Sequence, residues 1–167
     1  MNRKLMVAAT VMGALAAHGE TFRNGGFEEG KVGWAQYSGG YVIDAAVRHS
    51  GERAIKLVSK NARGAGARQD LSYAKPDRTP VVFGGWCKCA NAAAHPQFYL
   101  DIEYDDGSWE WGVHVSWRMG TYDWMRAIKV FEPKKPIRHR KRPRTMLRIT
   151  KIIGRQIRSS RKSMSNA

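Results

Sequence analysis

The sequence predicts an all-β sandwich of two antiparallel sheets. Between residues 22 and 133, short runs rich in Val, Ile, Tyr, Phe and Trp alternate with turn segments such as NGG, SGG, KPDRTP and DDGS. Strands and turns at this spacing are typical of a sandwich. Apolar residues do not repeat at the helical period over any useful length of this part of the chain, which argues against a helical fold.

The first 19 residues, MNRKLMVAATVMGALAAHG, have the layout of a secretory signal peptide. Arg3 and Lys4 precede an apolar run over 5–17, and small residues follow it. The run is shorter than the roughly 20 apolar residues that a membrane-spanning helix needs. We therefore expect a signal peptide over 1–19, cleaved after Ala16 or Gly19, no transmembrane segment, and a secreted or cell-surface protein. A buried N-terminal helix is the alternative.

The run VVFGGWCKCAN over 81–91 is expected to form a strand with two different faces. Because successive side chains alternate, Phe83, Cys87 and Cys89 would point into the core, and Trp86 and Lys88 to the opposite side. Cysteines two residues apart on a strand are too distant for a relaxed disulfide. We interpret both as small buried residues. A C-x-C metal site is the alternative, although no second Cys pair completes it.

Residues 97–117 predict a β-hairpin. The runs QFYLDIEY and WEWGVHVSW flank Asp105-Asp106-Gly107-Ser108, whose central Asp-Gly pair favours a two-residue type I′ turn. The same register places Trp111 and Trp117 in the core. The expected partners are Tyr104 with Trp109, Ile102 with Trp111, Leu100 with Val113 and Phe98 with Val115 on an apolar face, and Tyr99 with His114, Asp101 with Gly112 and Glu103 with Glu110 on a polar face.

The polar face of the hairpin, together with the outward side of 81–91, is the candidate ligand-binding surface. Glu103 and Glu110 would face each other, an unfavourable contact that a bound group could relieve. Sugars present C–H patches to aromatic rings, and hydroxyls to carboxylates and imidazoles. A solvated sheet face is the alternative. The candidate residues are Trp86, Lys88, Tyr99, Asp101, Glu103, Glu110 and His114, with Trp86 and Tyr99 as the stacking platforms.

An ordered series of segments resembles the carbohydrate-binding modules of the galactose-binding-like jelly-roll superfamily, of the type attached to cellulases and xylanases. The resemblance covers about 110 residues, from Arg23 to Pro133, and it implies a jelly-roll sandwich that grips sugars on a concave sheet face. The segments are RNGGFEEGKVGW (23–34), VRHSGERAIKL (47–57), GARQDL (66–71), VVFGGWCKCAN (81–91), YLDIEYDDG (99–107) and GTYDW (120–124).

The resemblance also implies a structural calcium ion near the start of the domain. Asn24 is similar to a residue of the family's opening turn, and Trp34 to the aromatic residue that closes the opening loop. Glu28 is similar to the family's acidic residue beside the ion, and Ser50 and Gly51 to the loop that offers backbone carbonyls, suitable ligands for Ca²⁺. The family's last acidic ligand has no counterpart, since no Asp or Glu follows Glu132.

The C-terminal part differs from the body in composition. From Lys134 onward the chain has 13 Lys and Arg and no acidic residue, whereas the preceding part has 16 basic and 14 acidic residues, for a total net charge of +15. The body is thus nearly neutral, and the high charge does not indicate that it binds polyanions.

Three interpretations of this basic part are open. It could be an arm that binds nucleic acid or an anionic surface through salt-sensitive contacts, a basic amphipathic helix over 146–157, or the product of a shifted reading frame. We expect the third. The predicted organisation is then a jelly-roll domain over 20–136, incomplete at its C-terminal edge, and a disordered or short helical tail over 137–167.

The predicted function is non-catalytic binding of a polysaccharide or glycan, with nucleic acid not the expected partner. One alternative is that the basic tail acts as a nucleic-acid or anionic-surface arm. A second alternative is a jelly-roll glycoside hydrolase that uses Glu103 and Glu110, because carboxyl groups about 5 Å apart suit a retaining mechanism.

Overall fold

The computed structural model describes residues 6–10, 22–58, 64–71, 73–138 and 145–149, and every regular element in these ranges is a strand. In chain order the strands are β1 (Met6–Thr10), β2 (Ala35–Ser38), β3 (Val42–Asp44), β4 (Ala54–Leu57), β5 (Ala65–Leu71), β6 (Val81–Ala92), β7 (Gln97–Glu103), β8 (Trp109–Ser116), β9 (Gly120–Phe131) and β10 (Thr145–Ile149).

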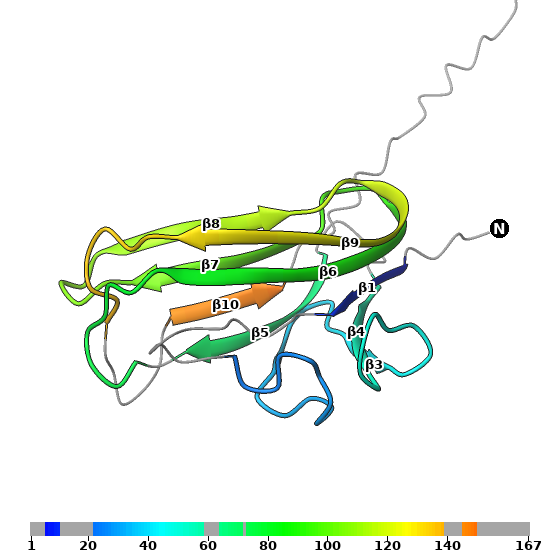
Figure 1. Cartoon of the computed structure of the whole chain (residues 1–167), viewed down its shortest axis with the longest axis horizontal. Coiled ribbons are helices and arrows are strands. Elements are labelled where there is room, and N and C mark those ends of the chain that lie inside the picture. Colours follow the sequence, from blue (N-terminus) through cyan, green and yellow to red (C-terminus); the bar gives the residue numbers. More distant parts are fainter. Residues whose placement is uncertain (1–5, 11–21, 59–63, 72, 139–144, 150–167) are drawn as a thin grey trace, which may run out of the picture.

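The strands form two five-stranded sheets, which lie against each other as a sandwich (Figure 1). The first, here called the β6 sheet, has the order β3-β4-β1-β6-β9, and the second, the β7 sheet, has the order β2-β5-β10-β7-β8. All pairs of neighbouring strands are antiparallel. The predicted all-β sandwich is confirmed.

The core lies between the sheets and is built from alternate residues of each strand. Phe83 of β6 meets Phe98 of β7 edge to face, with ring centroids 5.6 Å apart. Cys87 and Cys89 are buried and carry free thiols, as the alternation predicted, while Trp86 lies on the other side of the strand. The two sulfurs are 3.7 Å apart.

The loop over 22–34 is organised by Asn24. Its side-chain amide donates to the carbonyls of Gly30 and Val32, at 3.0 and 3.1 Å, and its backbone carbonyl accepts from the Trp34 indole at 3.0 Å. Trp34 is buried against Phe27, with ring centroids 5.0 Å apart. The expectation that Trp34 closes this loop is consistent with this geometry.

Strand β1 lies inside the segment that the sequence assigns to a signal peptide. It occupies the middle of the β6 sheet and pairs with β4 on one side and β6 on the other. Signal-peptide processing stays a prediction. Cleavage after Ala16 or Gly19 would remove a strand that joins two halves of a sheet.

The basic C-terminal part also contributes to the sandwich, contrary to expectation. The side chain of Ile137 is 1% exposed, and its backbone bridges Asp77 and Tyr104. Strand β10 lies between β5 and β7 and pairs with both. The β7 sheet is therefore not left open there, and residues 146–149 of the helix considered as an alternative over 146–157 belong to a strand instead; the rest of that segment lies outside the described residues.

Candidate functional site

Four of the seven predicted binding residues share the outer face of the β7 sheet. Phe98, Leu100 and Ile102 of β7 point into the core. The alternate residues of β7, which are Tyr99, Asp101 and Glu103, therefore point outward. His114 of β8 lies opposite Tyr99 and shares their side.

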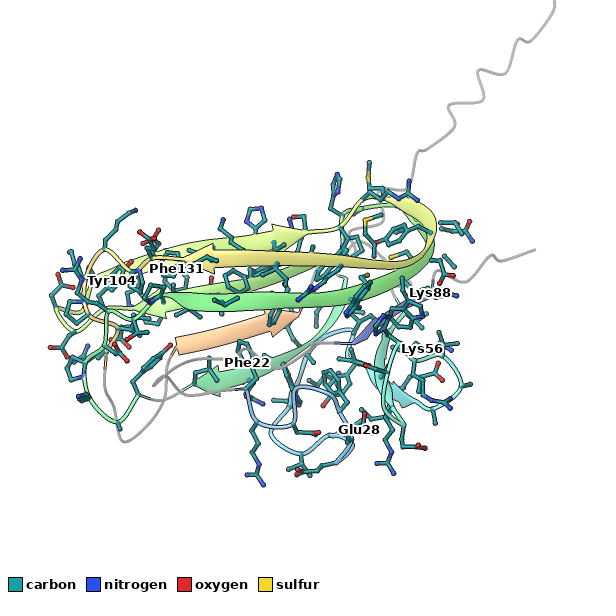
Figure 2. The ribbon with its side chains drawn as sticks, viewed as in Figure 1. Phe22, Glu28, Lys56, Lys88, Tyr104 and Phe131 are labelled. Carbon is teal, nitrogen blue, oxygen red and sulfur yellow. The ribbon has the colours of Figure 1, made fainter. Side chains whose placement is uncertain are left out.

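The other strand of the predicted surface belongs to the other sheet. Trp86 and Lys88 lie on β6, so the prediction that they share a face with the hairpin is wrong. Alternation shows that two residues lie on the same side of a strand, but not which sheet the strand joins. Figure 2 shows Lys88 and Tyr104 at opposite ends of the sandwich.

Trp86 and Lys88 each contact other side chains of the protein. The His49 ring stacks on the Trp86 indole, with centroids 4.0 Å apart and planes 15° apart, and Trp124 packs edge-on against His49. The Lys88 ammonium pairs with Asp123 at 2.9 Å. The Trp86 ring face that would stack on a sugar is therefore covered by a side chain of the same molecule.

The predicted Glu103–Glu110 pair is not formed, because the turn has a different type. The N–H of Gly107 donates to the Tyr104 carbonyl and that of Tyr104 to the Ser108 carbonyl, both at 2.9 Å. With Gly107 at φ 83°, this is a three-residue loop with a left-handed glycine, not a type I′ turn. It places Glu110 opposite Ile102 and Glu103 opposite Trp109.

A bulge restores the predicted register farther along the hairpin. Leu100 pairs with Val113 and Ile102 with Glu110, so Trp111 and Gly112 together oppose Asp101. Gly112 has φ 70°, the left-handed conformation that glycine adopts most easily. From Leu100 to Phe98 the partners are those that the alternation predicted.

The bulge turns Trp111 toward solvent, whereas the sequence predicted that it lies in the core. Its side chain is 64% exposed, and its ring stacks on that of Trp109 with centroids 4.5 Å apart and planes 8° apart. Trp117, by contrast, is buried as predicted. The sequence signal for the bulge was the glycine in the middle of a strand.

These side chains form one surface, which we call the tryptophan face. It consists of Tyr99, Asp101, Glu103, Trp109, Trp111 and His114. Through β10 it continues to β5, where Arg68 and Asp70 share rows with Tyr99 and Asp101. Of the side chains of the tryptophan face, Trp111 and His114 are exposed, Tyr99 and Trp109 are half-buried, and Asp101 and Glu103 are buried.

The polar groups beside Trp111 are fixed by the bulge. The Gly112 N–H donates to Oδ1 of Asp101 at 3.0 Å, and Nδ1 of His114 lies 2.8 Å from the Gly112 carbonyl. Because a carbonyl only accepts, Nδ1 must carry a proton, and in the neutral ring Nε2 is then an acceptor. A Cβ added at Gly112 would meet no atom within 4 Å, so the space next to Trp111 is open.

Glu103 lies at the turn end of the face and is held by an arginine. Its Oε1 accepts from Nη1 of Arg138 at 2.6 Å, and its carbonyl accepts from the Arg138 N–H at 2.9 Å. Arg138 belongs to the basic stretch. No local pattern predicts this position for Arg138, because its partner is 35 residues away along the chain.

Glu110 has a different environment from Glu103. It accepts a hydrogen bond from the Tyr104 hydroxyl and a second from Lys134 at 3.2 Å. These contacts lower the pKa of Glu110, whereas burial and the Glu110 carboxylate raise the pKa of Tyr104 to about 12. Glu110 therefore connects the β7–β8 hairpin to Lys134, in the segment after β9.

The predicted metal-binding loops do come together, but the contacts differ from a calcium site. Oε2 of Glu28 accepts from the Glu52 N–H at 3.0 Å, and a Cβ at Gly51 would lie 2.2 Å from Oε1. The Gly51 carbonyl accepts from the Arg48 guanidinium at 3.1 Å. Ser50, the third predicted ligand, is exposed.

This arrangement does not fit a calcium ion. Ca²⁺ takes six to eight oxygen ligands, and here one of the expected carbonyls is engaged by a cation that repels a second cation. Glu28 is the one acidic side chain that the resemblance supplies.

Comparisons with known proteins give no family for the chain. No protein-family model matches it, and a search of curated proteins finds no significant relative. In the part of the chain that the structure describes, no helix has the length and apolar character to cross a membrane.

Proposed function

We propose that the tryptophan face binds a carbohydrate chain without cleaving it, and that the protein is a module of the galactose-binding-like jelly-roll type. The observation that carries this proposal is the exposed Trp111 ring, which stacks on Trp109 and is followed in the chain by Gly112, whose carbonyl is hydrogen-bonded to the His114 imidazole. A large aromatic ring is not normally left in water by folding alone, and an exposed apolar patch with a polar rim is typical of a binding site.

The neighbouring groups suit the chemistry of a sugar. The C–H face of a pyranose ring can pack on the open side of Trp111, above Gly112, and lose contact with water. Tyr99 is half-buried and His114 is exposed, and both can exchange hydrogen bonds with sugar hydroxyls, whereas Asp101 and Glu103 are 3% and 5% exposed and support the face from within. Tyr99 and His114 extend the surface along the sheet, and the resemblance to carbohydrate-binding modules agrees with this assignment.

The glycosidase alternative loses its geometric basis. It rested on Glu103 and Glu110 facing each other, but the register places them opposite Trp109 and Ile102, on different sides of the sheet. A pair of carboxyl groups that flanks a glycosidic bond must share one side. We therefore do not propose hydrolysis by this pair.

The experiment is a binding panel with soluble xylan, mixed-linkage β-glucan and galactomannan, measured by affinity gel electrophoresis and calorimetry. We expect Trp111→Ala to abolish binding and to leave the melting temperature close to wild type, since the ring is largely exposed. Trp86→Ala, on the other sheet, is the matched control and should keep binding. The proposal is overturned if wild type binds none of the polysaccharides, or if Trp111→Ala binds as wild type does.

A further inference from the structure

Of the four edge strands that the structure describes, β9 offers the longest regular edge. The edge strands are β3 and β9 in the β6 sheet, and β2 and β8 in the β7 sheet. Edge strands are commonly kept from pairing with other chains by short length or by a bulge. β3 and β2 have only three and four residues, and β8 is interrupted by the bulge at Trp111 and Gly112. From Met125 to Phe131, by contrast, β9 keeps an unbroken register of seven pairs with β6.

This regular part of β9 carries branched apolar side chains that are exposed to solvent. Ile128 is 47% and Val130 59% exposed. Both lie on the outer face of the β6 sheet, because Phe131 is buried and successive side chains alternate. Val82 of β6, which lies opposite Val130, extends the apolar strip. On its other side β9 pairs with no strand that the structure describes. An exposed apolar strip along an unpaired regular edge indicates a surface that pairs with another strand.

The charges of β9 restrict the strand that can pair with it. Arg126 and Lys129 are both exposed, and a strand with a cation opposite either of them would be repelled. A second copy of β9 avoids this repulsion if it runs antiparallel and is centred on Ile128. That register places Val130 of the second copy opposite Arg126, and Ala127 of the second copy opposite Lys129.

We propose that two copies of the protein form a symmetric dimer in which the β9 strands pair antiparallel and join the two β6 sheets. Ile128 of each copy then lies opposite Ile128 of the other, at the two-fold axis. The exposed Glu132 lies two residues beyond Val130 and is therefore diagonal to Arg126 of the other copy, within reach of a long side chain. The two-fold axis repeats this ion pair, so the edge is complementary to itself. The proposal does not depend on carbohydrate binding.

The test is sedimentation velocity of the full chain over a range of concentrations. We expect wild type to dimerise. Ile128→Lys should be folded, since Ile128 is 47% exposed, but monomeric, because two lysines would face each other at the axis. The matched control is Val42→Lys, which should dimerise as wild type does, because Val42 is 52% exposed on the three-residue edge strand β3. The proposal is overturned if wild type is monomeric at every concentration, or if Ile128→Lys dimerises as tightly as wild type.

Two further experiments test the register. Arg126→Glu should raise the dissociation constant of the dimer about tenfold, because both ion pairs become repulsions, and adding Glu132→Arg should restore it by exchanging the charges. Ile128→Cys should form a disulfide-linked dimer on mild oxidation, since opposed residues of antiparallel strands have Cα atoms roughly 4.5–5.5 Å apart, within disulfide range. Val42→Cys is the control and should not cross-link. A charge exchange that fails to restore the dimer, or an Ile128→Cys variant that does not cross-link, refutes pairing about Ile128.

Discussion

The backbone N–H of Gly112 donates a hydrogen bond to the carboxylate of Asp101, with a distance of 3.0 Å, at the bulge that turns Trp111 toward solvent. One glycine thus determines three features of the tryptophan face. It accepts the left-handed backbone, it gives Asp101 a hydrogen-bond donor, and it leaves the space beside Trp111 open.

Replacing this glycine should weaken both stability and binding. Gly112→Ala must place a Cβ at φ 70°, which costs about 1 kcal/mol and corresponds to a fall in melting temperature of about 2–4 °C. Asparagine tolerates this backbone conformation better than alanine does, so the melting temperature of Gly112→Asn should fall less than that of Gly112→Ala. Thermal unfolding of the two variants checks the strain, and equal melting temperatures for wild type and Gly112→Ala would contradict it.

The hairpin shows what alternation can and cannot predict. Partners from Phe98 to Leu100 follow from the alternation, because a slip would mix apolar and polar faces. The turn could not be predicted in the same way, since Asp106-Gly107 fits a two-residue and a three-residue loop equally well. The choice depends on whether Tyr104 pairs with Ser108 or with Trp109, and that one-residue difference decides the positions of Glu110 and Trp111.

The sequence also did not predict which sheet each strand belongs to. The sides of β6 were predicted correctly, yet Trp86 and Lys88 do not lie on the tryptophan face because β6 and β7 join different sheets. For β10, five residues are too few to separate a strand from a helical turn by periodicity. Its neighbours β5 and β7 decide its structure, and both are distant in sequence.

Deleting residues 1–19 should destabilise the domain strongly. The deletion removes β1, and with it the hydrogen bonds that join β4 to β6 across the β6 sheet. We expect a melting temperature lowered by well over the roughly 2–4 °C that corresponds to 1 kcal/mol. A synthetic peptide of residues 1–19 should restore part of the loss, whereas a scrambled peptide should not. An unchanged melting temperature after the deletion would show that β1 is dispensable.

Two C-terminal deletions should have very different effects on the melting temperature. Removal of 150–167 keeps β10, Ile137 and Arg138, whereas removal of 134–167 takes away a strand of the β7 sheet, a buried core side chain and the partner of Glu103. The longer deletion should therefore lower the melting temperature much more, and it should weaken polysaccharide binding. Equal melting temperatures for the two truncated proteins would mean that the basic stretch up to Ile149 is not part of the folded domain.

Calcium should not stabilise the protein. Because the Arg48 guanidinium donates to the carbonyl of Gly51, we expect millimolar calcium, the range in which extracellular modules bind it, to leave the melting temperature as it is in EDTA. Glu28→Gln is the control, and its melting temperature should be equally insensitive to calcium. A calcium-dependent rise in wild type that Glu28→Gln lacks would restore the ion to this loop.

Acid should remove a contribution to stability that comes from Asp77. The hydroxyl and N–H of Thr79 donate to its carboxylate at 2.7 and 2.8 Å, and these hydrogen bonds lower the pKa of Asp77 below 3.8. A carboxyl whose pKa is lower in the folded state stabilises that state above its ordinary pKa, and the contribution is lost as the pH falls through the folded-state value.

Thr79→Val removes the hydroxyl donor but keeps the shape of the side chain. The melting temperature of wild type should therefore exceed that of Thr79→Val near neutral pH, and the difference should shrink as the pH is lowered past 3.8. A difference that is constant across this range would place the effect of Thr79 in packing and not in the ionised Asp77.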